Sequence, residues 1–351
     1  MTINQHIGMQ RLINQQIVGK NHHTAESVLR GMGAMQAQEY KQALWAIGTR
    51  MQSATITHIE TAIAEAKIVR TWTQRGTIHF VPAEDTHWML KLCASRIVTG
   101  HGRRMNQLGL THENITYCEK LILNTLVSGK SLTRAEIFKL FDDAGIATTG
   151  QRGYHILWHL AHLGIICMGA MQGKEQTFVL LDEWVPNPRN LSRDEALTEL
   201  VWRYFSSRGP ATDYDFAWWS GLTLTDTRIG MHNNDSRLVK MVMDDKTYWM
   251  ANPSPPTHSQ KVYLLPAYDE FLLGYQDRKA VLAGEYAQQV VPGNNGVFQP
   301  IVVIDGQVVG TWKHTIKQKT HLITPHLFIP SDEIEAIIHP KKRRFRDFVD
   351  G

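Results

Sequence analysis

The predicted order of helices and strands recurs three times along the chain, and this recurrence limits the possible folds more than any other feature. Each copy predicts a helix, a short gap, further helices opened by Ser, Thr or Asp, and then two strand-like stretches joined by a polar turn. Helices joined by a tight turn and followed by a hairpin form a winged helix. The sequence therefore predicts an α+β fold with three tandem winged-helix units.

The middle copy is the clearest of the three. Residues 117–129, YCEKLILNTLVSG, carry apolar residues at intervals near 3.6, and Ser131 or Thr133 can cap the helix that follows. After the GIATTG break, residues 151–164 predict another amphipathic helix. Residues 165–181, IICMGAMQGK and EQTFVLL, then predict a hairpin.

The other two copies follow the same order with weaker patterns. In the third copy, residues 194–251, Gly209 ends one predicted helix and Pro210 precedes the next, and a turn at Asp244 to Lys246 joins two alternating strands. In the first copy, residues 24–48 predict helix, and residues 70–81, RTWTQRGTIHFV, predict a hairpin that turns at Gln74, Arg75 and Gly76.

The last part of the chain changes character after about Lys261. Its strand-rich stretches include GVFQPIVVIDGQVVGTWKH, where DGQ predicts a hairpin turn, and they favour a small C-terminal β-barrel unit. A final helix with acids at its start and bases at its end matches the helix dipole. The predicted domains are residues 1–110 (first winged helix, with MQAQEY on a helix), 111–190 (second winged helix), 191–260 (third winged helix) and 261–351 (β-barrel unit and basic C-terminal helix).

Composition places the chain among ordinary globular proteins. No stretch approaches the roughly 18 apolar residues of a membrane span, and the polar start MTINQHIGMQ is not a signal peptide, so we expect a cytoplasmic protein that does not bind membranes. The three cysteines lack the paired spacing of a zinc ribbon or a disulfide framework, and we expect buried free thiols.

Positive charge is concentrated in runs, although the net charge is only +4. No Asp or Glu occurs from Thr86 to His112 or from Ala144 to Lys174, and the chain ends with the basic cluster KKRRFR. Each Lys or Arg placed beside a phosphate releases condensed counterions, so such runs favour nucleic acid as the partner. The alternative is that these runs are solvated helix faces and a tail that aids solubility.

Five stretches resemble, in order, the tandem winged-helix DNA-binding family that includes the AlkZ-like DNA glycosylases. They are MQAQEYKQALWAIGTR, RTWTQRGTIHFV, SSRGPATDYDFAWWSGL, LLPAYDEFLLGYQDR and GVFQPIVVIDGQVVGTW. The resemblance covers nearly the whole chain. It implies three tandem winged helices and a β-barrel unit around a DNA-sized channel, and an enzyme that removes alkylated bases and unhooks interstrand crosslinks. It implies no cofactor and no metal.

The same resemblance implies a catalytic pair at Gln36 and Gln38, which flank Ala37 in a Gln-x-Gln motif. On an ideal helix two such residues point about 200° apart, so they share a face only where the helix bends or ends. The family places the pair at a helical irregularity near the DNA. The alternative is a pair of exposed polar positions on an amphipathic helix.

Two amides suffice only for a substrate that reacts readily. Glycosidic cleavage passes through an oxocarbenium-like sugar, which carboxylates usually stabilise. A glutamine can only accept a hydrogen bond from water and donate two of its own, which holds the nucleophile in line. The motif therefore predicts cationic N7- or N3-alkylated purines, which leave as neutral bases, and undamaged DNA should be spared.

Several further residues are predicted to contact DNA. Arg75 and Gly76 fall at the tip of the first wing, with His79 on the returning strand, while Trp72 has a core alternative. A recognition helix in the middle copy would present Gln151, Arg152 and His155 to a groove. The remaining predicted contacts are Arg103, Arg104 and Lys313.

Other chemistries receive less support. The stripe of His155, His159 and His162 has spacing that can bind zinc, but core packing and DNA contact explain it better. Asp269 and Glu270 invite a hydrolase interpretation, but adjacent acids should point apart. No glycine-rich phosphate loop, GxSxG or HExxH motif occurs, so we expect no nucleotide cofactor. We expect a monomer, and the alternative function is a non-catalytic winged-helix regulator that only binds DNA.

Overall fold

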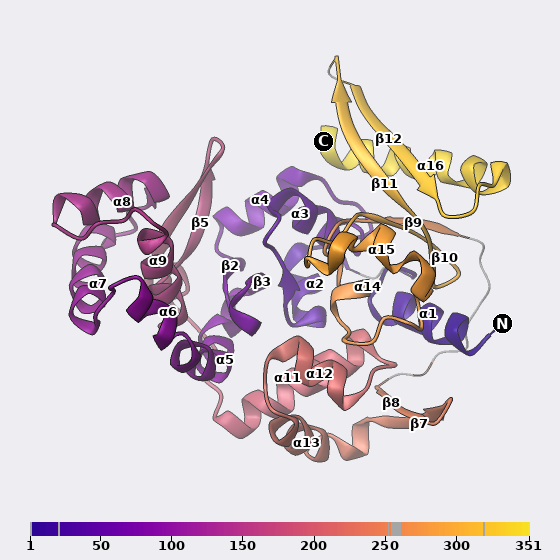
Figure 1. Cartoon of the computed structure of the whole chain (residues 1–351), viewed down its shortest axis with the longest axis horizontal. Coiled ribbons are helices and arrows are strands. Elements are labelled where there is room, and N and C mark those ends of the chain that lie inside the picture. The colour runs from indigo at the N-terminus through magenta and orange to yellow at the C-terminus, as the bar shows by residue number, and fades with distance from the viewer. Residues whose placement is uncertain (1, 20–21, 252, 254–260, 319) are drawn as a thin grey trace. The chain divides into compact units, whose positions relative to one another are not determined.

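The computed structural model describes residues 2–19, 22–251, 253, 261–318 and 320–351. The chain divides into two compact units, which we call the terminal unit (residues 1–59 and 197–351) and the central unit (residues 60–196) (Figure 1). Each unit combines helices with antiparallel strands, which confirms the mixed helix and sheet class. The four predicted domain boundaries stay a prediction, and the one after residue 260 falls outside the described residues.

The central unit contains two hairpins joined in one sheet. Its strands are β2 (Ile68–Trp72), β3 (Ile78–Pro82), β4 (Leu132–Thr133), β5 (Ile166–Gln172) and β6 (Glu175–Leu180). They run in the order β3-β2-β5-β6-β4, and Arg70 opposite Met168 joins β2 to β5. Both hairpins lie where the alternating sequence predicts them.

The helices of this unit are α4 (Ile56–Ala64), which begins in the terminal unit, α5 (Thr86–Gly100), α6 (Gly102–Gln107), α7 (His112–Leu126), α8 (Arg134–Asp143), α9 (Arg152–His162) and α10 (Leu181–Trp184). The apolar periodicity predicts α4, α7, α8 and α9, and it does not predict α5, α6 and α10. Thr133 caps α8: its hydroxyl accepts from the backbone N–H of Glu136, and the Glu136 carboxylate accepts from the backbone N–H of Thr133. The core places Trp72 in a stack on Phe178, which agrees with the core alternative for Trp72.

The terminal unit brings together elements from both ends of the chain (Figure 1). Its helices before the C-terminal sheet are α1 (Ile3–Asn14), α2 (Ala25–Met32), α3 (Tyr40–Gly48), α11 (Arg193–Arg208), α12 (Asp213–Ser220) and α13 (Leu224–His232). The hairpin of β7 (Val239–Met243) and β8 (Lys246–Met250) follows α13, and its turn residues Asp244 and Asp245 have φ of +47° and +59°. The third copy therefore has the predicted order of helices and hairpin.

The predicted C-terminal β-barrel is wrong for the residues that the structure describes. The strands β9 (Val262–Leu265), β10 (Ile301–Ile304), β11 (Gln307–Lys317) and β12 (Thr320–Leu327) form an open antiparallel sheet in the order β12-β11-β10-β9. Closure needs long, tilted strands with a matching stagger. Here β9 and β10 have four residues each, so the sheet has two unclosed edges. The predicted turn is correct, because Asp305 and Gly306 have the positive φ of a tight hairpin.

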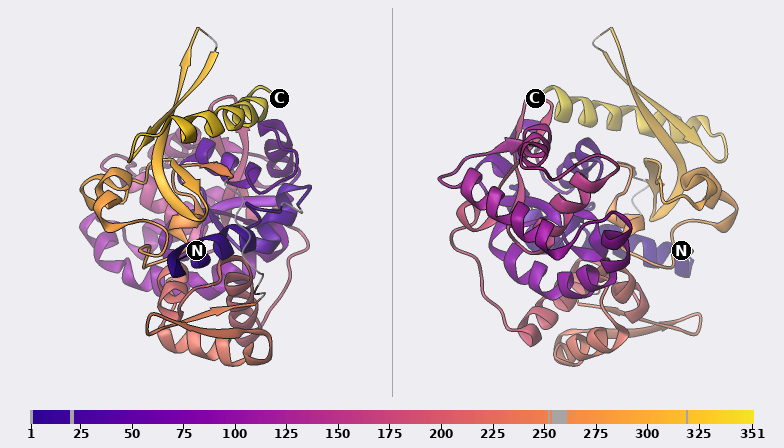
Figure 2. Two further views of the ribbon diagram at one scale, coloured as in Figure 1. Left: turned by 90° about the vertical axis from the view of Figure 1, so that its right-hand side faces the viewer. Right: turned by 60° about the vertical axis from the view of Figure 1, so that its left-hand side comes forward.

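The long hairpin of β11 and β12 extends beyond the two shorter strands (Figure 2). The predicted C-terminal helix is present as α16 (Asp332–Asp350). Its Phe345 and Phe348 pack on Trp45 of α3, and Phe345 also contacts Trp312 of β11. Two short helices, α14 (Glu270–Leu273) and α15 (Ala287–Val290), replace part of the predicted strand content between β9 and β10.

No helix in the described part of the chain is long and apolar enough to span a bilayer.

Candidate functional site

The Gln-x-Gln segment lies between two helices, not on one, and this corrects the helix predicted over residues 24–48. The helix α2 ends at Gly33, whose φ of +75° favours glycine. Met35 and Gln36 are extended as the short strand β1 (Met35–Gln36), and α3 begins only at Tyr40. One glycine in a left-handed conformation therefore separates two helices that the apolar periodicity joins.

The break between the two helices lets the two amides meet. On one continuous helix residues i and i+2 point about 200° apart, and residues 36–38 lie outside both helices. The Nε2 of Gln36 donates a hydrogen bond to the Oε1 of Gln38 at 3.4 Å. Gln36 is 9% exposed, Ala37 is fully buried, and Gln38 is exposed. The buried amide thus restricts the orientation of the exposed one.

A buried carboxylate holds the backbone of this segment. The Oε1 of Glu270 accepts the backbone N–H of Gln36 at 3.0 Å. The other oxygen of Glu270 accepts from the guanidinium of Arg208, at 3.0 Å from Nε and 2.7 Å from Nη2, and from the indole N–H of Trp219 at 3.0 Å. Glu270 is 1% exposed and Arg208 is fully buried. The sequence did not predict this network, although Arg208 and Glu270 fall in two of the stretches that carry the family resemblance.

The adjacent acid belongs to a second buried ion pair. Both oxygens of Asp269 accept from Arg50 at 2.9 Å, and Arg50 also donates to the side-chain oxygen of Gln15 at 2.6 Å. Asp269 further caps α14 through the backbone N–H of Phe271. The two acids therefore face different arginines, as predicted for adjacent residues. Their burial opposes the hydrolase interpretation, because neither oxygen pair faces solvent.

The first predicted wing tip is packed against a helix of its own unit. Arg75 is partly exposed and has a φ of +54°. The carbonyl oxygen of Gly76 accepts from the indole N–H of Trp158 at 3.2 Å, and a Cβ at Gly76 would lie 3.3 Å from the same ring. His79 is buried, and its Nδ1 lies 3.0 Å from the carbonyl oxygen of Thr77. Burial does not favour a direct DNA contact by His79, whereas contacts by Arg75 and Gly76 stay predictions.

The predicted contacts around α9 divide into two groups. Arg104 donates to the side chain of Gln151, so these two side chains share one surface, and Arg103 is exposed beside Arg104 in the sequence. Arg152 is only partly exposed and donates to the backbone carbonyls of Ala147 and Leu108. A role in binding DNA stays a prediction for all four residues.

His155 is buried, which does not favour a direct DNA contact, and its predicted role in a groove stays a prediction. Its Nδ1 lies 2.9 Å from the Nε2 of His101, and the His101 ring packs on Trp158. His162 also packs on the ring of Trp158, and its Nδ1 donates to the carbonyl oxygen of Trp158 at 2.8 Å. The spacing of the histidines places them on one face of α9, and this face packs into the core.

Burial lowers the pKa of these histidines. It lowers the pKa of His101, His155 and His159, and it lowers that of His162 to about 4 from an ordinary value of 6.5. Neutral imidazoles at pH 7 can stack and exchange hydrogen bonds without a counterion. Within the described residues, no group of three or more His, Cys, Asp or Glu side chains is arranged to hold a metal ion.

Positive charge within the terminal unit lies near the start of α3. Lys313 is exposed on β11, while the neighbouring Trp312 is buried and donates to the carbonyl oxygen of Leu265 at 2.8 Å. Burial, His321 and the charge of Lys41 lower the pKa of His314. Lys41 is therefore close to β11, and it follows Gln38 by three positions. Trp312 is a core residue.

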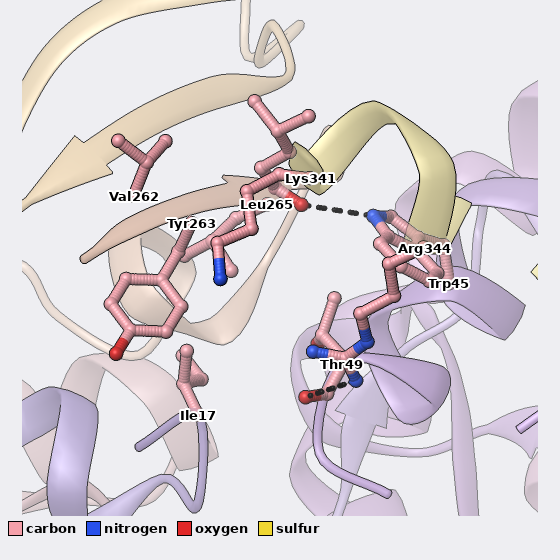
Figure 3. A pocket seen from close by; sticks show the side chains of 9 residues that line it. Ile17, Trp45, Thr49, Val262, Tyr263, Leu265, Lys341 and Arg344 are labelled. Atoms are coloured by element: carbon pink, nitrogen blue, oxygen red, sulfur yellow. Dashed lines mark hydrogen bonds between the residues drawn. The ribbon is translucent and has the colours of Figure 1, made fainter. Parts of the chain in front are cut away.

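The C-terminal basic cluster is partly structural. Arg344 donates to the carbonyl oxygens of Gly48, Thr49 and Met51, where it caps the end of α3 (Figure 3). The adjacent cavity between α16, α3 and β9 encloses about 40 Å³. Small-molecule pockets typically enclose roughly 300–1,000 Å³, so this cavity does not accommodate an extruded base.

Comparisons with known proteins agree on one family. The model of a family described as "DNA glycosylase AlkZ-like" matches residues 29–338. A Streptomyces sahachiroi protein named interstrand DNA cross-link repair glycosylase is 25% identical over 341 residues, which cover 90% of this chain and 88% of that protein. The solved structure of the Streptomyces sahachiroi DNA glycosylase AlkZ superposes with a TM-score of 0.80 at 22% identity, over 98% of this chain and 97% of that one. At this identity the structural likeness establishes the fold.

Proposed function

Because this chain belongs to the family of AlkZ-like DNA glycosylases, we propose that it hydrolyses the N-glycosidic bond of purines alkylated at N7 or N3 in double-stranded DNA. Such a purine carries positive charge and departs as a neutral base. Little protonation of the leaving group is then required, and the enzyme needs mainly to orient water and shield the developing sugar cation.

Gln36 and Gln38 are the proposed catalytic pair. The observation that carries this role is their side-chain hydrogen bond of 3.4 Å on a segment whose backbone is fixed by Glu270. Gln36 restricts the rotamers of Gln38, so the exposed amide can accept a hydrogen bond from water in one preferred orientation. A water held in line with the anomeric carbon loses less entropy when it reaches the transition state, which lowers the activation free energy.

DNA binding is assigned to cationic and polar surfaces in each unit. In the central unit these surfaces carry Arg75, Arg103, Arg104 and Gln151, and in the terminal unit the exposed Lys313 lies on β11. We further propose that each of the three helix and hairpin copies acts as a winged helix. Contacts of this kind grip phosphates and position the duplex, but they read little sequence, which suits an enzyme that searches for damage.

The name of the Streptomyces relative suggests that interstrand crosslinks are also substrates. A crosslinked purine alkylated at N7 or N3 carries the same positive charge and offers the same leaving group. The proposal includes unhooking of such crosslinks by a monomer in the cytoplasm, without a metal or a nucleotide cofactor.

The test uses duplex DNA that contains N7-methylguanine. After incubation with protein, heating in alkali breaks the strand wherever a base has been removed. The wild-type protein should release the base, and Gln38→Ala should lower the rate by on the order of 100-fold. Glu39→Ala is the matched control, because Glu39 is also exposed and makes no side-chain cap on α3.

Two results would oppose the proposal. Wild-type binding without any cleavage would favour the alternative, a regulator that uses the same folds for DNA binding alone. Equal cleavage by the wild-type protein and by Gln38→Ala and Gln36→Ala would keep the glycosylase activity and remove the catalytic role of the pair.

A further inference from the structure

We infer that Glu270 and Arg208 are positioning residues, which set the backbone of the Gln-x-Gln segment so that its two amides meet. This inference rests on the proposed catalytic role of Gln36 and Gln38. It adds a requirement outside the motif, because the ion pair comes from α11 and α14, far from residues 35–38 in sequence.

The ion pair grips the segment at three backbone atoms. Arg208 donates from Nη1 to the carbonyl oxygen of Met32 and from Nη2 to that of Ala34, each at 2.6 Å. Glu270 accepts the backbone N–H of Gln36 at 3.0 Å. These atoms alternate along the chain from the last residue of α2 to the first catalytic amide. The path of the backbone through the glycine break is therefore defined by side chains from elsewhere in the fold.

The guanidinium is itself held on every side. Its carbon lies 4.4 Å above the ring of Trp219, and the indole N–H of Trp219 donates to the same Glu270 oxygen that binds Arg208. Gly274 leaves space for it, because a Cβ there would lie 3.1 Å from the Cδ of Arg208 and 2.7 Å from the carbonyl oxygen of Glu270. A planar, fixed guanidinium can direct several hydrogen bonds at once, which a flexible lysine cannot do.

Positioning matters here because the amides have little intrinsic reactivity. A carboxylate base tolerates small displacements through its charge, whereas a neutral amide acts only through hydrogen-bond direction. A shift of about 1 Å at a reacting group can cost on the order of 100-fold in rate. The backbone path that lets Gln36 and Gln38 meet is the property that the ion pair maintains.

The neighbouring ion pair supplies a matched control. Arg50 and Asp269 are equally buried and lie in the same unit, and Asp269 is adjacent to Glu270 in sequence. No hydrogen bond from either residue to Met32, Ala34 or Gln36 is found among the described contacts. Glu270→Gln and Asp269→Asn therefore remove the same charge from similar surroundings, but only the first weakens the grip on the segment.

The experiment measures single-turnover release of N7-methylguanine from duplex DNA with full-length protein in excess. Rates are normalised to the folded fraction from near-ultraviolet circular dichroism, and affinity for undamaged duplex is measured separately. We expect Glu270→Gln to lower the rate by on the order of 100-fold with affinity changed less than about threefold. Asp269→Asn should keep the rate within about threefold of the wild-type value, since the segment remains held.

A double variant tests whether the ion pair acts through the amides. Adding Glu270→Gln to Gln38→Ala should cause no further loss, because the positioned group is already absent. If Glu270→Gln fails to fold, Arg208→Lys replaces it in the test. This variant keeps the positive charge and removes the planar set of guanidinium donors, and Arg50→Lys is its control. We expect Arg208→Lys to lower the rate far more than Arg50→Lys does, as for the two acid variants.

The outcomes separate this inference from the proposed function. If Gln38→Ala abolishes release while Glu270→Gln behaves like Asp269→Asn, or if the two losses add in the double variant, only the positioning role is overturned. If Gln36→Ala and Gln38→Ala both release the base at the wild-type rate, the catalytic pair and the positioning role are both overturned.

Discussion

The polar side chains around the Gln-x-Gln segment and those around α9 are buried in different ways. The terminal unit contains two buried ion pairs, Arg208 with Glu270 and Arg50 with Asp269. The core of the central unit contains neutral histidines, His155 and His162, that stack and exchange hydrogen bonds with their neighbours. In the terminal unit an ion pair thus fixes a backbone segment through hydrogen bonds, whereas in the central unit neutral imidazole rings pack one face of a helix.

This difference follows from what each site must hold. A guanidinium and a carboxylate bind several backbone groups with defined directions, but they must be fully satisfied because an unpaired buried charge is very unfavourable. Neutral imidazoles bind few groups and cost little to bury, so they suit the inner face of a helix. The comparison predicts that the two units respond differently to mutation and to acid.

The largest expected effect is the loss of one charge in the terminal unit. Arg208→Ala leaves Glu270 buried without its counterion, and we expect a loss of about 3–5 kcal/mol in the free energy of unfolding. His162→Phe in the central unit removes one hydrogen bond and keeps the ring, for a loss of about 1 kcal/mol. Urea unfolding of both variants provides the measurement. Equal losses in the free energy of unfolding would contradict the larger cost that we assign to an unpaired buried charge.

The second effect is a pH dependence that His162 gives the central unit. Burial lowers the pKa of His162 to about 4 from 6.5. Between these pH values the unfolded chain binds a proton there and the folded chain does not, so stability is complete above pH 6.5 and falls as the pH decreases. For this group the loss is about 1.4 kcal/mol per pH unit.

Local measurement makes this second prediction specific. Hydrogen exchange of peptides from α9, corrected for the intrinsic pH dependence of exchange, should reveal lower protection at pH 5 than at pH 7. His162→Phe should reduce that difference. A wild-type protection factor that does not change with pH would contradict the assigned protonation of His162.

The smallest expected effect is on stability and compares the capping boxes of two helices, one in each unit. Thr133 caps α8 in the central unit, and Thr133→Ala should cost about 1 kcal/mol. In the terminal unit, Asp215 binds the Thr212 cap and also accepts the backbone N–H groups of Gln276 and Asp277, at 2.9 Å and 3.2 Å. Asp215→Ala should therefore cost about 2 kcal/mol, because it leaves several partly buried donors without this partner. Differential scanning fluorimetry can rank the two variants, and the opposite order would contradict the prediction.

Local signals in the sequence were sufficient for most elements. Capping residues such as Thr133, alternating strands, and turn residues such as Asp305 and Gly306 act over a few positions, so they identified helices such as α8 and the predicted hairpins. The motif Gln36-Ala37-Gln38 was also visible, together with the family that it suggests. Its conformation was not, because apolar periodicity continued across Gly33 and predicted one helix.

The sequence by itself determined the order of elements, the caps and turns, and the identity of the candidate amides. Only the tertiary structure decided that the C-terminal sheet stays open, that His155 is buried, and that Gln36 is held by Glu270, a residue 234 positions away. Local chemistry acts between near neighbours, whereas strand closure, burial and ion pairing depend on groups that only folding brings together.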